Sequence, residues 1–128
     1  MKVYIDASSD IQYASYYIYG LYEVFGRNNV SFSSDYFENF KHDNHFFAFI
    51  IINDTSQKKV IIDFTDDSSI DTAAQQWCDI YGKINLEFTD KNLDKIISIG
   101  PSFGIRIFSL AETYWYAFSN LLKSFNRV

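Results

Sequence analysis

The chain has 128 residues, with 11 lysines and arginines against 16 aspartates and glutamates, so its formal net charge is −5. A chain of this length is expected to form one domain and to bury roughly two-thirds of its unfolded surface. The excess of acidic residues gives the surface the wrong sign for phosphate groups, which argues against nucleic acid as a partner. A composition of 48% hydrophobic residues with only one proline is typical of a folded chain.

The first residues and the single cysteine bear on location. The amino terminus lacks the basic start and the long apolar run of a secretory signal, and Cys78 cannot form an internal disulfide. The longest uncharged apolar run, Phe46–Ile52, is far shorter than the roughly 20 residues of a membrane-spanning helix. We therefore expect a cytoplasmic protein without a transmembrane segment.

The first elements are predicted to be a strand, a loop and a helix. Residues 2–6 form a short apolar run, and apolar residues from Ile11 to Phe25 recur at helical spacing. Ser8 or Ser9 is expected to cap this helix, where Asp10 suits the positive first turn. Gly26 is expected to end it.

The next stretch predicts strands and one hairpin. Val30 and Phe32 alternate with serines as in a short strand, and residues 35–44 are expected to form a loop with at most one helical turn. Residues 46–52 and 60–64 are continuous β-branched and aromatic runs, typical of strands covered on both faces. Residues 53–59 are too few for a crossover helix, so this pair is predicted to be a hairpin.

The second half of the chain predicts two more strands and two helices. Asp71 or Ser69 is expected to cap a short helix that extends to Gln76, and residues 78–83 and 95–99 are expected to be strands. A Gly-Pro-Ser-Phe-Gly turn at 100–104 precedes the longest periodic segment. This segment is predicted to be a helix, and its main apolar stripe comprises Ile107, Leu110, Ala111, Tyr114, Ala117, Phe118, Leu121, Leu122 and Phe125.

Together these elements predict an α/β fold built as a single domain over residues 1–128. We expect a Rossmann-like open sheet of about six strands, mostly parallel with one hairpin, and helices on both of its faces.

Four aspartates near the end of a central strand are the first candidates for chemistry. Asp63, Asp66, Asp67 and Asp71 lie close in the sequence, and like charges held together raise one another's pKa toward a useful range. The alternative is that Asp66 and Asp67 form a turn while Asp71 caps a helix, and we favour it.

Position in the sheet favours a function for the polar loops. Ligands of open α/β sheets bind beyond the carboxyl ends of the strands, where three loops are expected to converge: residues 6–10, 65–69 and 100–104. In the third loop two glycines flank Pro101, so a ligand can approach the main chain closely. An ordinary tight turn is the alternative.

Other sites are less well supported. His42 and His45 would need a third ligand such as Asp35 or Glu38 to hold zinc, and we favour an ordinary polar loop. Cys78 has no histidine near it in the sequence and is expected to be a small core residue rather than a nucleophile. The chain has no G-x-G-x-x-G, no phosphate loop and no C-x-x-C, so nucleotide binding of those kinds is not indicated.

Aromatic residues outside the apolar stripes suggest a partner surface. Tyr13, Tyr16 and Tyr19 lie off the stripe of the first helix, and Trp115 and Tyr116 lie off the stripe of the last one. Tyrosine and tryptophan are favoured where one end of the side chain is apolar and the other is wet. The equally weighted alternative is that a sheet covered on both faces uses two sides of each helix.

Two motifs carry a family resemblance. The stretch Cys78-Asp79-Ile80-Tyr81-Gly82-Lys83-Ile84-Asn85 and the later Gly100-Pro101-Ser102-Phe103-Gly104 loop, with the Asp63-Phe64-Thr65-Asp66 turn upstream, resemble the N-terminal half of bacterial polysaccharide-biosynthesis glycosyltransferases. In that family an Asp-x-Tyr-x-Lys-x-Asn stretch precedes a Gly-Pro-Ser-Phe-Gly loop. The similarity covers roughly residues 60–108; the first half of the chain agrees in element order alone.

The resemblance implies a GT-B architecture of two Rossmann-like halves that face a cleft. The N-terminal half contributes mainly acceptor contacts, and the nucleotide-sugar donor is held chiefly by the C-terminal half. This chain would then hold no cofactor, and without that second half it would not transfer sugar by itself. The departure from a glycine-rich first loop, here residues 6–10, puts donor contacts from this side in doubt.

On this hypothesis the acceptor is a glycan or a lipid-linked sugar, at the inner face of the membrane. The residues expected to contact it are Asp6, Ser8, Ser9, Ser102 and Phe103. The base for the acceptor hydroxyl would be Asp66 or Asp67. The alternative function is a non-enzymatic module that forms a homodimer through its aromatic helix faces.

Overall fold

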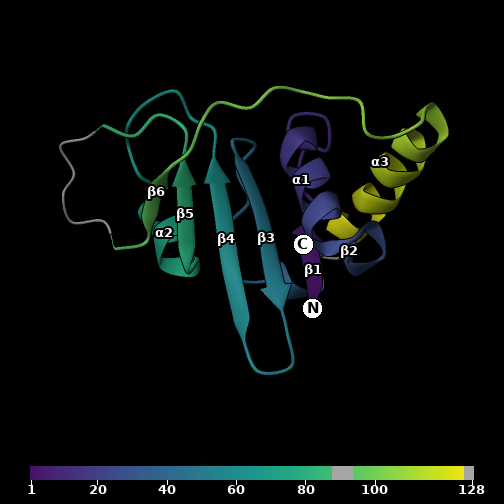
Figure 1. Cartoon of the computed structure of the whole chain (residues 1–128), viewed down its shortest axis with the longest axis horizontal. Helices are drawn as coiled ribbons and strands as arrows, with labels where there is room; N and C mark the ends of the chain where they lie inside the picture. The colour runs from purple at the N-terminus through teal and green to yellow at the C-terminus, as the bar shows by residue number, and fades with distance from the viewer. Residues whose placement is uncertain (88–93, 126–128) are drawn as a thin grey trace.

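The computed structural model describes residues 1–87 and 94–125, and within them the chain forms an α/β fold (Figure 1). The elements in chain order are β1 (Lys2–Asp6), α1 (Ser15–Phe25), η1 (Arg27–Asn29), β2 (Val30–Ser33), η2 (Asp35–Phe37), β3 (Phe46–Ile52), β4 (Gln57–Asp63), α2 (Thr72–Trp77), β5 (Ile80–Lys83), β6 (Ile96–Ser98) and α3 (Leu110–Phe125), where η marks a single 3-10 turn. The described strands form one open sheet in the order β2-β1-β3-β4-β5-β6.

All strands of this sheet except β3 point the same way (Figure 1). The pairs β1/β2, β4/β5 and β5/β6 are parallel, whereas β3 is antiparallel to both of its neighbours, β1 and β4. The predicted hairpin is confirmed: β3 and β4 are joined by a tight turn in which Asn53 Oδ1 accepts the Ser56 N–H at 2.7 Å. Every strand but β3 therefore ends at one edge, which we call the C-terminal edge of the sheet.

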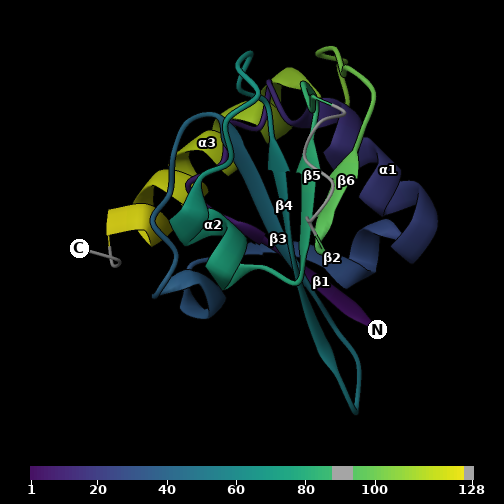
Figure 2. The ribbon, with the colours of Figure 1, turned by 90° about the vertical axis from the view of Figure 1, so that its left-hand side faces the viewer.

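Alternate residues of the strands enter two separate hydrophobic clusters, as period-two geometry requires. One cluster combines strand residues with Ala14, Ile18 and Leu21 of the first helical segment; its strand members are Val3, Ile5, Val30, Phe32, Phe47, Phe49, Val60 and Ile62. The other contains Ala74 of α2 and Phe37 of η2, with Phe46, Ala48, Ile50, Ile61 and Tyr81 from the strands. Figure 2 shows α1 and α2 on opposite sides of the sheet.

The start of α1 differs from the prediction. Neither Ser8 nor Ser9 caps the helix, because a separate turn intervenes in which Asp10 Oδ1 accepts the N–H groups of Gln12 and Tyr13, each at 2.9 Å. The regular helix therefore begins only at Ser15, and it has no side-chain cap. Its end agrees with the prediction: Gly26 follows at φ +81°, a left-handed conformation that favours glycine.

The predicted boundaries of α2, β5 and β6 hold to within two residues, whereas β4 begins at Gln57 rather than at residue 60. Asp71 caps α2, since its Oδ1 accepts the Ala74 N–H at 2.8 Å, and the helix ends one residue later than predicted. Strand β5 begins at Ile80 rather than at residue 78, because the Cys78 N–H still donates to the Ala74 carbonyl at the end of α2, at 3.1 Å.

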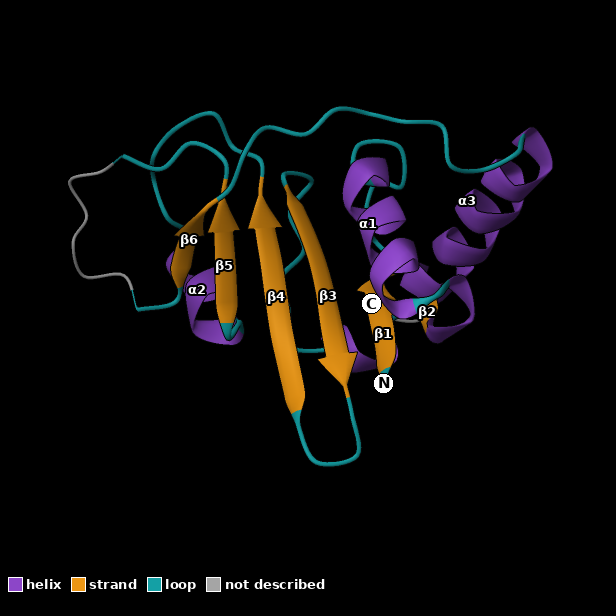
Figure 3. Ribbon diagram, in the orientation of Figure 1, coloured by secondary structure: helices purple, strands orange, loops and turns teal. Residues whose placement is uncertain are grey.

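Helix α3 packs against β2 at the edge of the sheet (Figure 3). The side of α3 that faces the sheet is the opposite of the expected one. Tyr116, expected off the core-facing stripe, is half-buried against Phe32 and Phe108, whereas most of that stripe is exposed. The reason is that β2 is an edge strand with free backbone groups. The inner side of α3 carries polar atoms that form hydrogen bonds with these groups: Lys123 Nζ donates to the Phe32 carbonyl at 3.1 Å.

A capping box sets the start of α3. The Ser109 N–H donates to Glu112 Oε2 at 2.8 Å, and the Glu112 N–H donates to Ser109 Oγ at 3.2 Å. This pair explains why the helix begins at Leu110 although the apolar periodicity starts at Ile107.

Candidate functional site

The candidate site lies at the C-terminal edge of the sheet. Asp6 is the last residue of β1, Asp63 of β4 and Lys83 of β5, so the loops 6–10 and 65–69 both start at this edge. The 100–104 loop follows the end of β6 at the same edge (Figure 1).

A buried network of charged and polar groups occupies the ends of β4 and β5. The ammonium group of Lys83 lies 3.2 Å from Asp63 Oδ2 and 3.2 Å from the Thr65 carbonyl oxygen, and both charged side chains are almost completely buried. Lys83 also donates to Thr65 Oγ1. Asp63 Oδ1 accepts the Thr65 N–H at 2.8 Å and its hydroxyl at 2.6 Å. The buried charges are therefore paired and hydrogen-bonded, as such groups must be.

Tyr81 completes this network. Its hydroxyl donates to Asp63 Oδ2, and the ring is fully buried. Burial, together with the hydrogen bond and the negative charge of Asp63, raises the pKa of Tyr81 well above its usual value. The phenol therefore stays protonated and serves as a hydrogen-bond donor.

The four polar residues of the Asp-x-Tyr-x-Lys-x-Asn stretch all form hydrogen bonds with β4 or with the turn that follows it. Lys59 N–H donates to Asp79 Oδ2 at 2.8 Å, Tyr81 and Lys83 bind Asp63, and the Asn85 amide donates to the Asp66 carbonyl. Each residue thus bonds to β4 or to the turn that follows it. Sequence reasoning assigned no role to Tyr81 or Lys83 from the residues alone; their strict alternation along one strand was the available signal.

Beside this network lies an oxygen-rich hollow of roughly 360 Å³. It is lined by Asp43, His45, Phe46, Asp63, Thr65, Ser69, Ile70, Asp71 and Thr72. The Asp43 carboxylate accepts the His45 N–H at 2.8 Å, and hydrogen bonds from the His45 backbone and side chain lower the pKa of Asp43. Carboxylates and hydroxyls are good partners for the hydroxyl groups of a polar ligand.

The two predicted catalytic carboxylates, Asp66 and Asp67, lie exposed in the loop that the network fastens. Asp67 Oδ1 accepts the Ser69 N–H at 2.8 Å and the Ser69 hydroxyl, and these bonds lower the pKa of Asp67. A carboxylate held in its ionised form accepts a hydrogen bond well, but its low proton affinity weakens it as a general base.

The predicted contacts on the first loop lie in a different place. Asp6 is fully buried, with Oδ1 accepting the Ser8 N–H at 2.9 Å and Oδ2 lying 3.5 Å from His42 Nδ1. Ser8 and Ser9 line a second hollow of roughly 310 Å³ against α3, which has no lining residue in common with the first. The Ser9 hydroxyl and the Asn120 side-chain amide are buried there without a hydrogen-bond partner among residues 1–87 and 94–125.

The third loop crosses the start of α1. Tyr17 donates its hydroxyl to the Gly100 carbonyl at 3.4 Å, and a hydrogen bond joins the side chains of Tyr17 and Ser102. Phe103 is 66% exposed, and its ring centroid lies 5.4 Å from that of Tyr16. Ser102 and Phe103 thus sit over α1 rather than over the hollow near Asp63.

Lys83 links the 65–69 loop to the 100–104 loop, the first through its side chain and the second through its backbone carbonyl. Its side chain binds Thr65, while its carbonyl oxygen accepts the Ile99 N–H at 3.0 Å, one residue before Gly100. The Asp66 turn and the Pro101 bend therefore arise from adjoining strand ends at one edge of the sheet.

The remaining candidates are the thiol of Cys78 and the histidine pair. Burial raises the pKa of Cys78 to about 11, which agrees with the interpretation of this thiol as a core residue. Among residues 1–87 and 94–125, no three histidine, cysteine, aspartate or glutamate side chains gather in a way that could hold a metal ion.

None of the helices in the described residues combines the length and the apolar character needed to cross a membrane. Comparison of the chain with protein families, with curated proteins and with solved structures gives no match.

Proposed function

We propose that this chain is the acceptor-side domain of a bacterial glycosyltransferase that builds cell-surface polysaccharide or lipopolysaccharide. The observation that carries the proposal is the position of Lys83. This residue belongs to the Asp-x-Tyr-x-Lys-x-Asn stretch of the family, and it contacts both the Thr65 turn and the residue before the Gly-Pro-Ser-Phe-Gly loop. The segments that resemble the family thus meet at one edge of the sheet.

The proposal has a finer architectural part. The chain would be the N-terminal, Rossmann-like half of a GT-B enzyme, with helices on both faces of its sheet. A second half would hold the nucleotide-sugar donor, so that this half alone would be inactive. The enzyme would work in the cytoplasm, at the inner face of the membrane, on a glycan or a lipid-linked sugar.

The chemistry of the edge supports a saccharide acceptor. Ligands of open α/β sheets bind beyond the carboxyl ends of the strands, and the hollow beside Asp63 offers carboxylates and hydroxyls to sugar hydroxyl groups. The exposed ring of Phe103 provides an apolar surface against which a sugar face can stack. Asp6, Ser8, Ser9 and Ser102 lie outside this hollow: Asp6 is fully buried, Ser8 and Ser9 line the hollow against α3, and Ser102 sits over α1. They would therefore make no contact with an acceptor bound beside Asp63.

The proposed reaction needs one proton acceptor from this half. Asp66 or Asp67 would take the proton of the acceptor hydroxyl while the oxygen of that hydroxyl attacks the anomeric carbon of the donor. The bond between the anomeric carbon and the phosphate oxygen would break, and the nucleoside diphosphate would leave with its electrons. Both carboxylates are exposed, as contact with a substrate requires. The lowered pKa of Asp67 makes Asp66 the better candidate.

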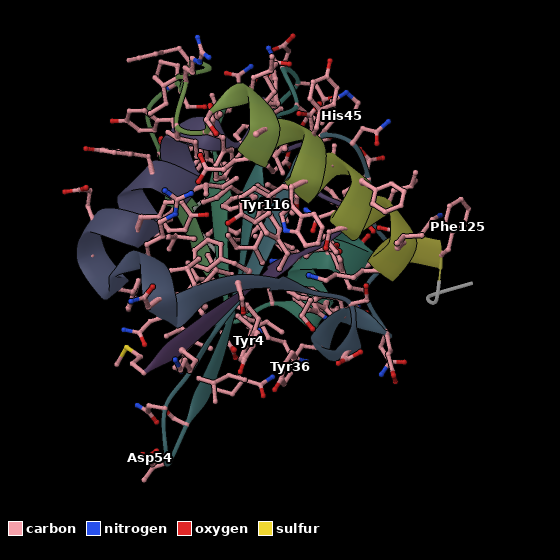
Figure 4. The ribbon with its side chains drawn as sticks, turned by 90° about the vertical axis from the view of Figure 1, so that its right-hand side faces the viewer. Tyr4, Tyr36, His45, Asp54, Tyr116 and Phe125 are labelled. Atoms are coloured by element: carbon pink, nitrogen blue, oxygen red, sulfur yellow. The ribbon has the colours of Figure 1, made fainter. Side chains whose placement is uncertain are left out.

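Titration of the protein with saccharides, monitored through the NMR shifts of its backbone amides, tests the proposal. Mono- and disaccharides should shift the amides of loops 65–69 and 100–104 in a saturable way, and Asp66→Asn should weaken this binding. Asp54→Asn is the matched control, because Asp54 lies in the β3–β4 turn, far from the C-terminal edge (Figure 4). Saturable binding of UDP-glucose by this chain alone, or saccharide shifts confined to the β3–β4 turn, would contradict the assignment.

A further inference from the structure

Helix α3 carries its apolar face outward, away from the sheet. The exposed residues of this face are Leu110, Ala111, Tyr114, Trp115, Phe118, Leu121, Leu122 and Phe125; we call this set the α3 face. The large members are each more than half exposed, and Figure 4 shows Phe125 pointing away from the domain. Contiguous apolar surface of this size on a folded domain marks an interaction site.

Specific contacts of the inner side fix this orientation. Glu112 forms an ion pair with Arg27 at 2.6 Å, Ser34 Oγ donates to the Lys123 carbonyl at 2.7 Å, and Tyr116 packs on Phe32. A rotation of the helix that buried its apolar side would break all of these contacts. The α3 face is therefore the free surface of a docked helix.

The α3 face has the spacing of a coiled-coil seam. Positions 111, 118 and 125 repeat every seven residues, and so do 114 with 121 and 115 with 122. This pattern is that of two neighbouring helices packed at about 20° with interlocking side chains.

We propose that the α3 face pairs with the α3 face of a second copy of this chain, antiparallel about a two-fold axis at Phe118. Because residues equally far from the axis on either side face each other, Trp115 lies opposite Leu121 of the partner subunit, and Ala111 opposite Phe125 of the partner subunit. Phe118 meets its own copy on the axis, and each of the other aromatics of the α3 face meets an aliphatic or small residue of the second copy. Parallel pairing would instead place each residue against its own copy, with tryptophan on tryptophan and alanine on alanine.

The area of the α3 face agrees with a two-fold dimer. Aromatic side chains present about 150–250 Å² each, so four rings at roughly two-thirds exposure offer on the order of 500 Å². The three leucines add roughly 200 Å² on the usual scale for buried side chains. The sum, about 700 Å², is close to the roughly 800 Å² that each partner contributes to a standard interface.

Charge also favours a second copy over a lipid surface. The α3 face contains no charged residue, so two chains of net charge −5 can join there without placing like charges in contact. Helices that lie on anionic membranes carry lysine and arginine on their flanks. The one described cation of α3, Lys123, points instead to the β2 backbone.

Sedimentation equilibrium with paired charge variants tests the dimer and its register. The wild-type chain should sediment as a concentration-dependent dimer. Trp115→Lys and Leu121→Glu should each raise the dimer dissociation constant by about 100-fold or more, as expected for charges placed at a central hot spot. Mixing the two variants should restore association, because the new lysine faces the new glutamate across the antiparallel pair.

Two controls separate this register from other outcomes. A mixture of Trp115→Lys with Trp115→Glu should not associate, since in the antiparallel pair these positions do not meet. Val24→Glu, on the exposed side of α1, should leave the dimer unchanged. A wild-type chain that is monomeric at every concentration would overturn the proposal and leave the α3 face to a different protein. Rescue by the 115/115 mixture would overturn the antiparallel register.

Discussion

Replacing Lys83 by methionine removes the cation from the most deeply buried ion pair among residues 1–87 and 94–125. Lys83 is 0% exposed and Asp63 is 1% exposed, and their charged atoms lie 3.2 Å apart. Methionine fills a similar volume without a charge. The Asp63 carboxylate keeps the hydrogen bonds from Thr65 and Tyr81, but its negative charge is left buried without a counter-ion.

The loss of stability follows from this burial. Leaving one partner of a buried ion pair uncompensated costs about 3–5 kcal/mol, against a total of about 5–15 kcal/mol for a domain of this kind. With a urea m-value of about 2 kcal/mol/M, the midpoint of unfolding should fall by roughly 1.5–2.5 M. Asp63→Asn alone should also destabilise, because it leaves the ammonium group unpaired. The double variant should recover at least about 2 kcal/mol relative to the sum of the two single changes.

Urea unfolding monitored by tryptophan fluorescence measures these differences, since Trp77 packs against the core residues Phe37 and Phe40. Lys58→Met is the matched control: Lys58 is exposed on the same strand as Asp63, and its replacement should change stability by less than about 0.5 kcal/mol. If Lys83→Met costs less than about 1 kcal/mol, or if the two single changes simply add, the account of a coupled buried pair is wrong.

Three further predictions use the same unfolding assay. Asp71→Ala should cost about 1 kcal/mol through loss of the α2 cap, and Asp71→Ser should restore most of it. Asn120→Leu should raise stability by about 1–3 kcal/mol, because it removes a buried amide that has no hydrogen-bond partner in the described part of the chain; an unchanged or lower stability would show that the amide is satisfied. The raised pKa of Cys78 means that the unfolded thiol ionises first, so stability should fall as pH rises from 9 toward 11, and Cys78→Ala should flatten this decline.

Much of the fold was predictable because it rests on local patterns. The uninterrupted apolar runs of β3 and β4, joined by a short polar segment, predicted a hairpin at the centre of the sheet, and the structure confirms it. Gly26 and Asp71 act through contacts within a few residues, and both were assigned correctly. The antiparallel pairing of β3 with β1 was not predicted, because the partner of a strand across the sheet leaves no local pattern.

The candidate site was predictable only in outline. The sequence indicated which loops follow strands, so their common edge could be expected. That Ser8 and Ser9 face α3 while Thr65 and Ser69 line a separate hollow depends on strand order, since β3 separates β1 from β4. The Asp63–Lys83 pair joins residues 20 positions apart, and only the register of β4 against β5 places them together.

The sequence by itself determined the type and order of the main helices and strands and the α/β class, because hydrogen bonds within a turn and apolar spacing along a segment act over a few residues. Tertiary structure alone decided what those elements face. The periodicity of α3 correctly indicates a helix with one apolar side, but the polar edge of β2 turns that side outward. The direction of an amphipathic helix depends on the surface that it meets, and the sequence of the helix does not contain that surface.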